Sequence, residues 1–333
     1  MQGTPVLGTE LLGANGNLGT ALLRPGVLSG INLTLDRFGE MGIRGVTVDV
    51  GYPLLLSSFP DHAGYLAFYE QVAAAVRAHG MLLSVEENPV FANTVFSSLE
   101  PDYAGLTLDS YAARQRAEAQ VIIDHLRPAY LSILDEPDTF STNLRLPLDS
   151  ASAAVQVVSE ELAGLRRGST KVGAGTGTWS DPAIDTALAT RTGIDYLSVH
   201  VYPIDAASLA NLDTVSAVAA RTHKPAVLDE TWLYKGANLA GGVVTDAKIG
   251  TFSSFGPLDA RFLKAIVGYA QSHGFAYVSP FWSGQFFAYL AWTPALGAAS
   301  YTAVRAAANQ VQSQAIERDV FSSTGRTYAE LAH

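Results

Sequence analysis

The feature of this sequence that most constrains its fold is a regular alternation of short apolar runs with longer segments of helical periodicity. Residues 45–53 (GVTVDVGYP) have the β-branched composition of a buried strand, and residues 65–80 (YLAFYEQVAAAVRAHG) have helical spacing that ends at Gly80. The alternation continues to a last helical segment over 301–319. Strands that alternate with helices predict a parallel sheet with right-handed crossovers.

Eight such units are predicted along the 333 residues. Seven strands are predicted over 45–53, 81–91, 130–137, 171–179, 195–203, 224–232 and 275–290. Helices are predicted over 65–80, 110–128, 149–166, 181–193, 207–223, 259–274 and 301–319. An eighth strand must come from the poorly defined residues 1–40, where 4–13 (TPVLGTELLG) is the best candidate.

This pattern predicts an α/β fold, a (β/α)8 TIM barrel, as a single domain over 1–333. An open doubly wound sheet is the alternative. It is less favoured because no glycine-rich phosphate fingerprint follows the first strand, as a dinucleotide-binding sheet would require. No composition break or linker indicates a second domain.

Composition excludes several classes of function. The net charge is −10 and no run of Lys or Arg could follow a phosphate backbone, which argues against a nucleic-acid partner and favours a neutral ligand. The chain has no cysteine, which excludes thiolate nucleophiles and cysteine-based metal sites. No stretch of about 18 apolar residues predicts a membrane span. No signal peptide is recognisable, so we expect a cytosolic protein or a mature form without its leader.

Acidic and aromatic residues gather at the predicted carboxyl ends of the strands, which form the active face of such barrels. They are Asp49, Tyr52, Glu86, Glu87, Asn88, Asp135, Glu136, Trp179, His200, Tyr202, Asp229, Glu230, Trp232, Phe281 and Trp282. Burial and like-charged neighbours raise a carboxyl pKa, so such a cluster can keep one acid protonated at neutral pH. Two carboxyls facing across a cleft are the minimum needed to cleave a glycosidic bond, although a single strand-end acid is equally explained as a helix cap or a partner of arginine.

Four segments resemble the motifs of the clan A glycoside hydrolases, a superfamily of (β/α)8 barrels. Residues 134–137 (LDEP) resemble the Asn-Glu-Pro signature that ends its fourth strand, and 227–232 (VLDETW) resemble the segment of the strand-seven nucleophile. Residues 197–203 (LSVHVYP) are similar to its strand-six motif, and 279–283 (SPFWS) resemble its strand-eight segment. The resemblance covers the second half of the predicted barrel.

The resemblance implies a role for each matching residue. Glu136 would be the acid/base and Glu230 the nucleophile of a retaining double displacement. Tyr202 and His200 would hold the nucleophile, and Trp282 would form the floor beneath the reacting sugar. It further implies neutral β-linked oligosaccharides or polysaccharides as substrates, no cofactor or metal, and export of the mature protein. The oligomeric state is left open.

The sequence departs from the clan pattern at two positions. Asp135 replaces the usual Asn before the acid/base, and a carboxylate there can only accept a hydrogen bond from a sugar hydroxyl. We expect Asp135 to raise the pKa of Glu136 further. Asp49 stands near the end of the second strand, where the clan often has Arg. Asn88, Glu86, Tyr52, Trp179 and Trp232 are expected to support substrate binding.

Two other functions are compatible with these residues. A divalent-metal sugar isomerase or epimerase would use Glu136, His200 and Glu230 with Asp49 or Glu86 as ligands for Mn²⁺ or Mg²⁺. No short HxH or HExxH-like spacing supports that hypothesis. A sugar-binding barrel that has lost its chemistry is the other alternative, and Asp135 is the residue that favours it.

Overall fold

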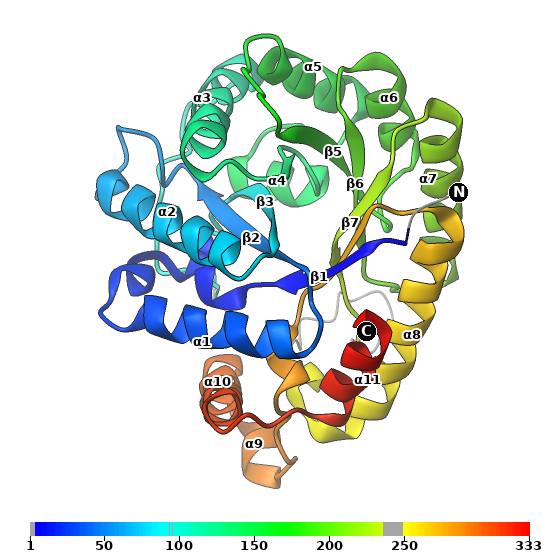
Figure 1. The fold of residues 1–333 in the computed structure, drawn as a ribbon. Helices are drawn as coiled ribbons and strands as arrows, with labels where there is room; N and C mark the ends of the chain where they lie inside the picture. Colours follow the sequence, from blue (N-terminus) through cyan, green and yellow to red (C-terminus); the bar gives the residue numbers. More distant parts are fainter. Residues whose placement is uncertain (1–3, 93, 95, 236–248) are drawn as a thin grey trace.

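The computed structural model describes residues 4–92, 94, 96–235 and 249–333. Its parallel strands form a closed barrel in chain order, with the first strand pairing with the last (Figure 1). The strands are β1 (Val6–Glu10), β2 (Gly45–Tyr52), β3 (Leu82–Pro89), β4 (Tyr130–Ser132), β5 (Lys171–Gly177), β6 (Tyr196–Val201), β7 (Ala226–Thr231) and β8 (Tyr277–Pro280). The predicted (β/α)8 TIM barrel is confirmed, and the candidate segment 4–13 contains β1.

Helices surround the barrel on its outside (Figure 1). They are α1 (Val27–Glu40), α2 (His62–Ala78), α3 (Leu108–Val121), α4 (Pro137–Leu144), α5 (Ala151–Leu162), α6 (Ala183–Arg191), α7 (Ala206–Thr222), α8 (Gly256–His273), α9 (Pro294–Ala298), α10 (Tyr301–Glu317) and α11 (Ser323–Ala332). Side-chain caps fix several helix starts, because Thr107, Ser150 and Asp205 each accept a backbone N–H from the first turn. None of the helices in the described ranges is both long and apolar enough to cross a membrane.

Two predicted strands are much shorter in the structure. The strand predicted over 130–137 is only β4, because the chain leaves the strand ladder after Ser132 and Pro137 begins the unpredicted helix α4. The strand predicted over 275–290 is β8 followed by a 3₁₀ turn (Ser283–Phe286). Short apolar runs do not distinguish a strand from a tight helical turn, which explains both differences.

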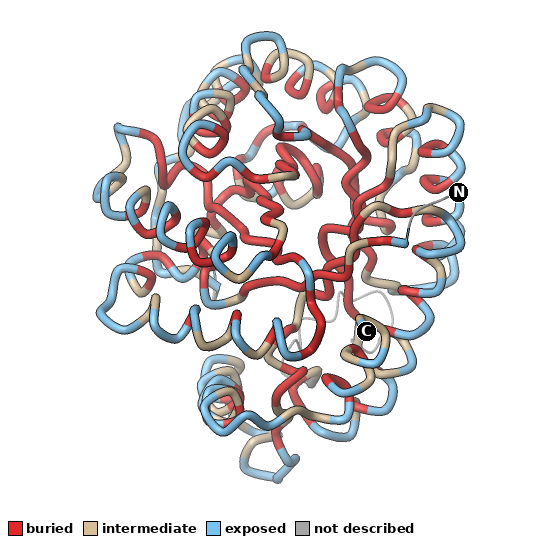
Figure 2. Tube along the Cα trace, in the orientation of Figure 1, coloured by how far each residue is buried: buried red, intermediate tan, exposed pale blue. Residues whose placement is uncertain are grey.

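Burial follows the alternation of the side chains. Figure 2 shows the strands buried along most of their length and the helices buried mainly on the side that faces the barrel. On β2, Val46, Val48 and Val50 are buried in the large hydrophobic core, whereas Thr47 and Asp49 are the intervening polar residues. This period of two places alternate residues inside the barrel.

Tyrosine rings fill the barrel at its amino-terminal end. Tyr130 packs edge-on to Tyr196 with ring centroids 5.2 Å apart, and Tyr277 lies 6.2 Å from Tyr130. Glycines on the neighbouring strands make room for these rings, since a Cβ atom at Gly8 or Gly173 would lie 2.2 Å from Tyr277 or Tyr196. The glycine-rich composition of β5 therefore reflects packing inside the barrel.

A buried carboxylate lies above these rings. Asp229 on β7 accepts hydrogen bonds from Ser84 (3.2 Å), Ser132 (2.5 Å) and Ser198 (2.7 Å), which come from β3, β4 and β6. Because hydroxyl groups from three strands satisfy it, Asp229 joins the strands across the barrel interior and is not free to act on a ligand.

Candidate active site

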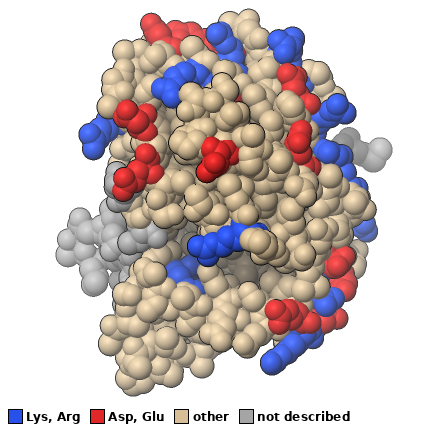
Figure 3. Space-filling view, turned by 90° about the vertical axis from the view of Figure 1, so that its left-hand side faces the viewer, with Lys and Arg blue, Asp and Glu red and all other residues tan. Residues whose placement is uncertain are grey.

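The carboxyl ends of the strands open into a cavity of about 1140 Å³. Figure 3 shows that the molecular surface is hollowed, with Lys or Arg side chains at the edge of the hollow. The cavity lining includes these residues predicted from the sequence: Asp49, Asn88, Asp135, Glu136, Trp179, Tyr202, Glu230, Trp232, Phe281 and Trp282. Glu86 and His200 are buried. His200 contacts the lining carboxyl groups of Glu136 and Glu230, and Glu86 contacts His200.

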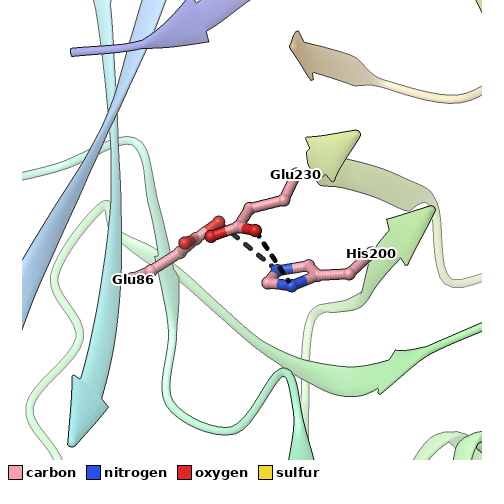
Figure 4. A group of neighbouring side chains, drawn as sticks. All are labelled: Glu86, His200 and Glu230. Atoms are coloured by element: carbon pink, nitrogen blue, oxygen red, sulfur yellow. Dashed lines mark ion pairs between the residues drawn. The ribbon is translucent and has the colours of Figure 1, made fainter. Parts of the chain in front are cut away.

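His200 on β6 lies at the centre of the acidic residues. Its Nδ1 atom is 2.9 Å from Glu136 Oε1 and 3.7 Å from Glu230 Oε2. Its Nε2 atom is 3.5 Å from Glu86 Oε1 and 4.0 Å from Asp135 Oδ2. Figure 4 shows Glu86 and Glu230 approaching the ring from β3 and β7. We call these five residues the inner cluster.

A bulge in β7 brings Glu230 to this position. The pairing of β7 with β6 advances from Ser198–Val227 to His200–Glu230, so β7 gains one residue over its neighbour. The pairing with β8 shifts in the same region. An extra residue in a strand reverses the alternation of side chains beyond it. As a result, Asp229 and Glu230 both reach the barrel interior although they are adjacent in the chain.

Protons in the inner cluster are unequally shared. Burial alone would lower the pKa of His200, but the carboxylates of Glu230, Asp135 and Glu86 raise it well above its ordinary value. Burial also raises the pKa of Glu86 and Glu230 well above the ordinary range, although the imidazolium opposes this. The protonation of the imidazole is therefore coupled to that of the acids around it.

Glu136 is the exception among these acids. Burial would raise its pKa, but hydrogen bonds from His200 and from the Thr139 hydroxyl (2.6 Å), together with the charge of His200, lower it. The expectation that Asp135 makes Glu136 more basic is therefore wrong. Asp135 is instead the residue whose pKa rises. Burial and the charge of Glu136 raise it to about 8, although the charge of His200 opposes this.

Two polar side chains hold carboxyl groups of the inner cluster in place. The Tyr202 hydroxyl donates to Glu230 Oε2 at 2.7 Å, and the Tyr202 ring packs 6.1 Å from Trp179. With the amide of Asn88 oriented so that its nitrogen faces Asp135, it donates to both Asp135 oxygens at 2.8 and 3.0 Å. Asn88 therefore fixes the carboxyl that stands where the clan A resemblance expects an asparagine.

Aromatic rings form the walls of the cavity. The Trp179 indole N–H donates to Asp138 Oδ2 at 2.9 Å, which fixes the ring near Tyr202. Trp282 packs edge-on to Phe281, with ring centroids 4.9 Å apart, and remains partly exposed. Trp232 is almost fully buried against Phe286 (5.8 Å) and leaves little surface for a ligand.

The remaining two predicted residues lie apart from the inner cluster. Asp49 lines the cavity and accepts hydrogen bonds from Asn15 (2.9 Å) and Asn17 (3.5 Å), and burial raises its pKa to about 7. Tyr52 faces the opposite side of β2, where its ring packs 5.3 Å from Tyr111 under α3. The structure does not bring Tyr52 to the cavity.

Sequence reasoning missed Glu10, the last residue of β1. Burial raises its pKa well above the ordinary value, and the carboxyls of Glu230 and Asp49 raise it further. Glu10 is therefore close enough to affect the protons of the inner cluster. Glu10 could have been found as an acid at the carboxyl end of a strand. It was missed because residues 1–40 have no clear strand pattern in the sequence.

The geometry bears on the choice between two hydrolytic mechanisms. The nearest oxygens of Glu136 and Glu230 share one neighbour, His200 Nδ1, so they are no farther apart than the sum of 2.9 and 3.7 Å. Retaining enzymes place their carboxyls about 5–5.5 Å apart, and inverting enzymes about 6.5–9.5 Å apart. This limit is compatible with the retaining spacing and reaches only the lower edge of the inverting range.

One set of side chains also has the spacing to hold a metal ion. Glu86, His200 and Glu230 each offer a ligand atom within 4.8 Å of the others, which makes them a candidate group among the described residues. The metal hypothesis from the sequence used Glu136, His200 and Glu230 with Asp49 or Glu86, so this group contains His200, Glu230 and one of the two optional ligands but lacks Glu136. In the structure Glu136 already accepts the hydrogen bond from His200.

Comparison with known proteins identifies the fold. No family model matches the sequence, and no curated protein matches it either. An exo-β-1,4-mannosidase from Opitutaceae bacterium strain TAV5 aligns with a TM-score of 0.59 and 15% identity over 99% of this chain. This chain spans only 59% of that mannosidase. The likeness confirms the (β/α)8 barrel as the fold.

Two further structures support the same conclusion. A rice β-glucosidase has a TM-score of 0.54 and 11% identity over 84% of this chain and 89% of its own. An endo-1,4-β-mannanase from Rhizomucor miehei has a TM-score of 0.53 and 11% identity over 84% and 86%. These proteins share the barrel fold with this chain at low sequence identity. The likeness therefore shows the architecture, and the chemistry has to be inferred from the residues around the cavity.

Proposed function

We propose that the protein is a glycoside hydrolase that cleaves β-linked glycans with retention of configuration. The observation that carries the proposal is the convergence of Glu136 and Glu230 on one nitrogen of His200, at the open end of the barrel. Aromatic walls suited to sugar faces surround the two carboxyls. The glycosidases and mannanase among the structural neighbours support the same assignment.

In the proposed reaction Glu230 attacks the anomeric carbon and the bond to the leaving oxygen breaks. Glu136 gives that oxygen a proton, and in the second step it takes a proton from the water that releases the sugar. The Tyr202 hydroxyl orients the attacking carboxylate. Asp135, held by Asn88, would accept a hydrogen bond from a sugar hydroxyl.

His200 explains how Glu136 can act as an acid although its pKa is lowered. The Nδ1–H proton lies on the hydrogen bond to Glu136 Oε1, so one short transfer converts the ion pair into a neutral imidazole and a protonated carboxyl. The charged imidazolium stabilises an ionised Glu230, so Glu230 must give up its own proton before this transfer removes that charge. We therefore infer that the acids share their protons through His200 during turnover.

The proposal is tested with aryl β-glycosides and neutral polysaccharides, using the native protein, Glu136→Ala and Glu230→Ala, each with and without azide. We expect activity in the native protein and its loss in both variants. Azide should give an α-glycosyl azide with Glu230→Ala and a β-glycosyl azide with Glu136→Ala. The opposite configurations would exchange the two roles. Activity that survives both changes would contradict the proposal.

A sugar isomerase that uses a divalent metal is the second candidate, because Glu86, His200 and Glu230 are spaced to bind an ion. Mn²⁺ or Mg²⁺ held there would polarise a sugar carbonyl or hydroxyl. Aldose–ketose conversion that requires added metal and stops with a chelator would favour this function. Binding of oligosaccharides without any turnover in either assay would favour the sugar-binding barrel.

A further inference from the structure

An arginine that has no acidic partner among the described residues lies in the cavity. Arg305 is on the face of α10 that lines the cavity, together with Tyr301, Asn309 and Gln312, at the three- and four-residue spacing of one helical face. α10 follows the eighth strand and lies beside α1 at the lower edge of the barrel in Figure 1. This helix therefore adds a wall to the cavity of the barrel.

The guanidinium of Arg305 stacks on Trp282, with its central carbon 4.7 Å from the ring centroid. The stacking stabilises the cation through the ring face, but it leaves the N–H groups without an acceptor. Among the described residues, no hydrogen bond or ion pair joins this guanidinium to a side chain or carbonyl. Burial lowers the pKa of Arg305, which shows that part of its hydration has been lost.

The other cation that lines the described part of the cavity behaves differently. Lys235 is almost fully buried, and its Nζ atom is 2.7 Å from Asp259 Oδ2. Its charge is therefore neutralised within the protein. Arg305 has no such neutralising partner in the part of the chain that the structure describes. A planar guanidinium forms two parallel hydrogen bonds with a carboxylate.

We propose that Arg305 binds an acidic group of the glycan, a carboxylate of the uronic acid type, in the cavity beside Trp282. This inference rests on the proposed function, since it names the substrate class of the same site. The glycan would be neutral over most of its length, as the acidic inner cluster requires, and would carry an acidic unit at the cavity wall formed by α10. The proposal replaces the sequence-based expectation of a wholly neutral ligand with a mostly neutral glycan that carries an acidic unit.

The test measures binding, so that it does not depend on turnover. Thio-linked β-disaccharides, which resist hydrolysis, are titrated into the native protein by calorimetry in matched glucosyl, mannosyl and galactosyl forms. Each is supplied with a neutral C6 hydroxymethyl group, a C6 carboxylate or a C6 sulfate. We expect at least one carboxylate form to bind about 10-fold or more tightly than its neutral counterpart, as a charge-assisted bidentate pair should give.

Variants separate recognition of the acid from support of the Trp282 ring. Arg305→Gln should abolish the preference for the acid and leave affinity for the neutral form within about two-fold, and Arg305→Lys should retain part of the preference. Arg318→Gln, an exposed position that ends the same helix, is the matched control and should change nothing.

Three results would overturn the proposal: equal affinity for acidic and neutral forms, no binding of any acidic form, or loss of neutral and acidic binding together in Arg305→Gln. A preference for sulfate over carboxylate would overturn the assignment of the carboxylate. Binding of an acidic form without hydrolysis of any glycoside would support this inference and contradict the proposed function, so the two can fail separately.

Discussion

Glu86 and Glu87 are adjacent on β3, yet they belong to two buried acidic clusters with different properties. Glu86 points into the barrel and joins the inner cluster around His200. Glu87 points outward to the helices, where its charge interacts with those of Glu118 on α3 and Glu161 on α5. We call Glu87, Glu118 and Glu161 the outer cluster. All three are fully buried.

The two clusters differ in partners and in access. Each acid of the inner cluster lies within 4.0 Å of the His200 ring, and the cluster adjoins a large cavity. In the outer cluster, neither oxygen of Glu87 or Glu161 has a hydrogen-bond partner among the described residues, and burial raises the pKa of both. Buried acids alone therefore do not define a functional site. A site also needs a group that can exchange protons with the acids and a cavity that can admit a ligand.

The largest contrast should come from replacing the two neighbours on β3. Glu86→Gln removes a carboxylate from the His200 ring and should lower kcat/KM by about 100-fold, the scale of a disrupted acid–base group. Glu87→Gln changes a carboxyl that faces the helices and does not line the cavity, so kcat/KM should stay within about two-fold. Steady-state kinetics on the best glycoside measures both. Equal losses in the two variants would contradict the distinction between the clusters.

A second contrast separates two tyrosines at strand ends. Tyr202→Phe removes the hydroxyl that donates to Glu230 and should lower kcat by about 10-fold, as loss of one hydrogen bond to a charged group does. Tyr52→Phe alters a ring packed under α3 and should leave kcat unchanged. Thermal unfolding of both variants controls for misfolding. A large decrease in kcat for Tyr52→Phe, in a variant as stable as the native protein, would show that Tyr52 acts in the site and would contradict this contrast.

The outer cluster should be visible in stability rather than activity. Burial raises the pKa of Glu118 from 4.5 to about 8, although the Leu55 N–H and the charge of Arg114 oppose this. The unfolded chain releases this proton first, so the stabilisation is complete below about pH 4.5 and is lost as the pH rises through about 8. Urea unfolding from pH 5 to 8 should show a shallower decline for Glu118→Gln, by at most about 1.4 kcal/mol per pH unit.

The exposed Glu100 provides the control for that measurement. Glu100→Gln should show the same pH dependence as the native protein. If Glu118→Gln declines as steeply as the native protein, Glu118 does not hold a proton in the folded state.

Much of the barrel could be predicted from the sequence because the apolar period changes between strands and helices. The strand-end rule also located Glu136, His200 and Glu230, which the structure brings together. It misplaced Tyr52, because a position near the end of a strand does not tell which face the side chain takes. The β7 bulge that turns Glu230 inward depends on pairing with both neighbouring strands, and the sequence of one strand does not encode it visibly.

The proton distribution was also beyond sequence reasoning. Asp135 precedes Glu136, so the sequence suggested repulsion between neighbours in the chain. In the structure His200, from a different strand, lies within hydrogen-bonding distance of Glu136, and this contact lowers the pKa of Glu136 against the effect of burial. Distances between residues far apart in the sequence set these pKa values, and only the folded barrel supplies them.

The central claim is that Glu230 in the inner cluster forms a covalent bond to the sugar. The most direct measurement treats the native protein with 2,4-dinitrophenyl 2-deoxy-2-fluoro-β-glycosides of the gluco, manno and galacto series and maps the label by peptide mass spectrometry. The account predicts a single adduct, on the peptide that contains Glu230 and on that side chain. An adduct on another carboxyl, or no adduct from any glycoside that the protein hydrolyses, would contradict it.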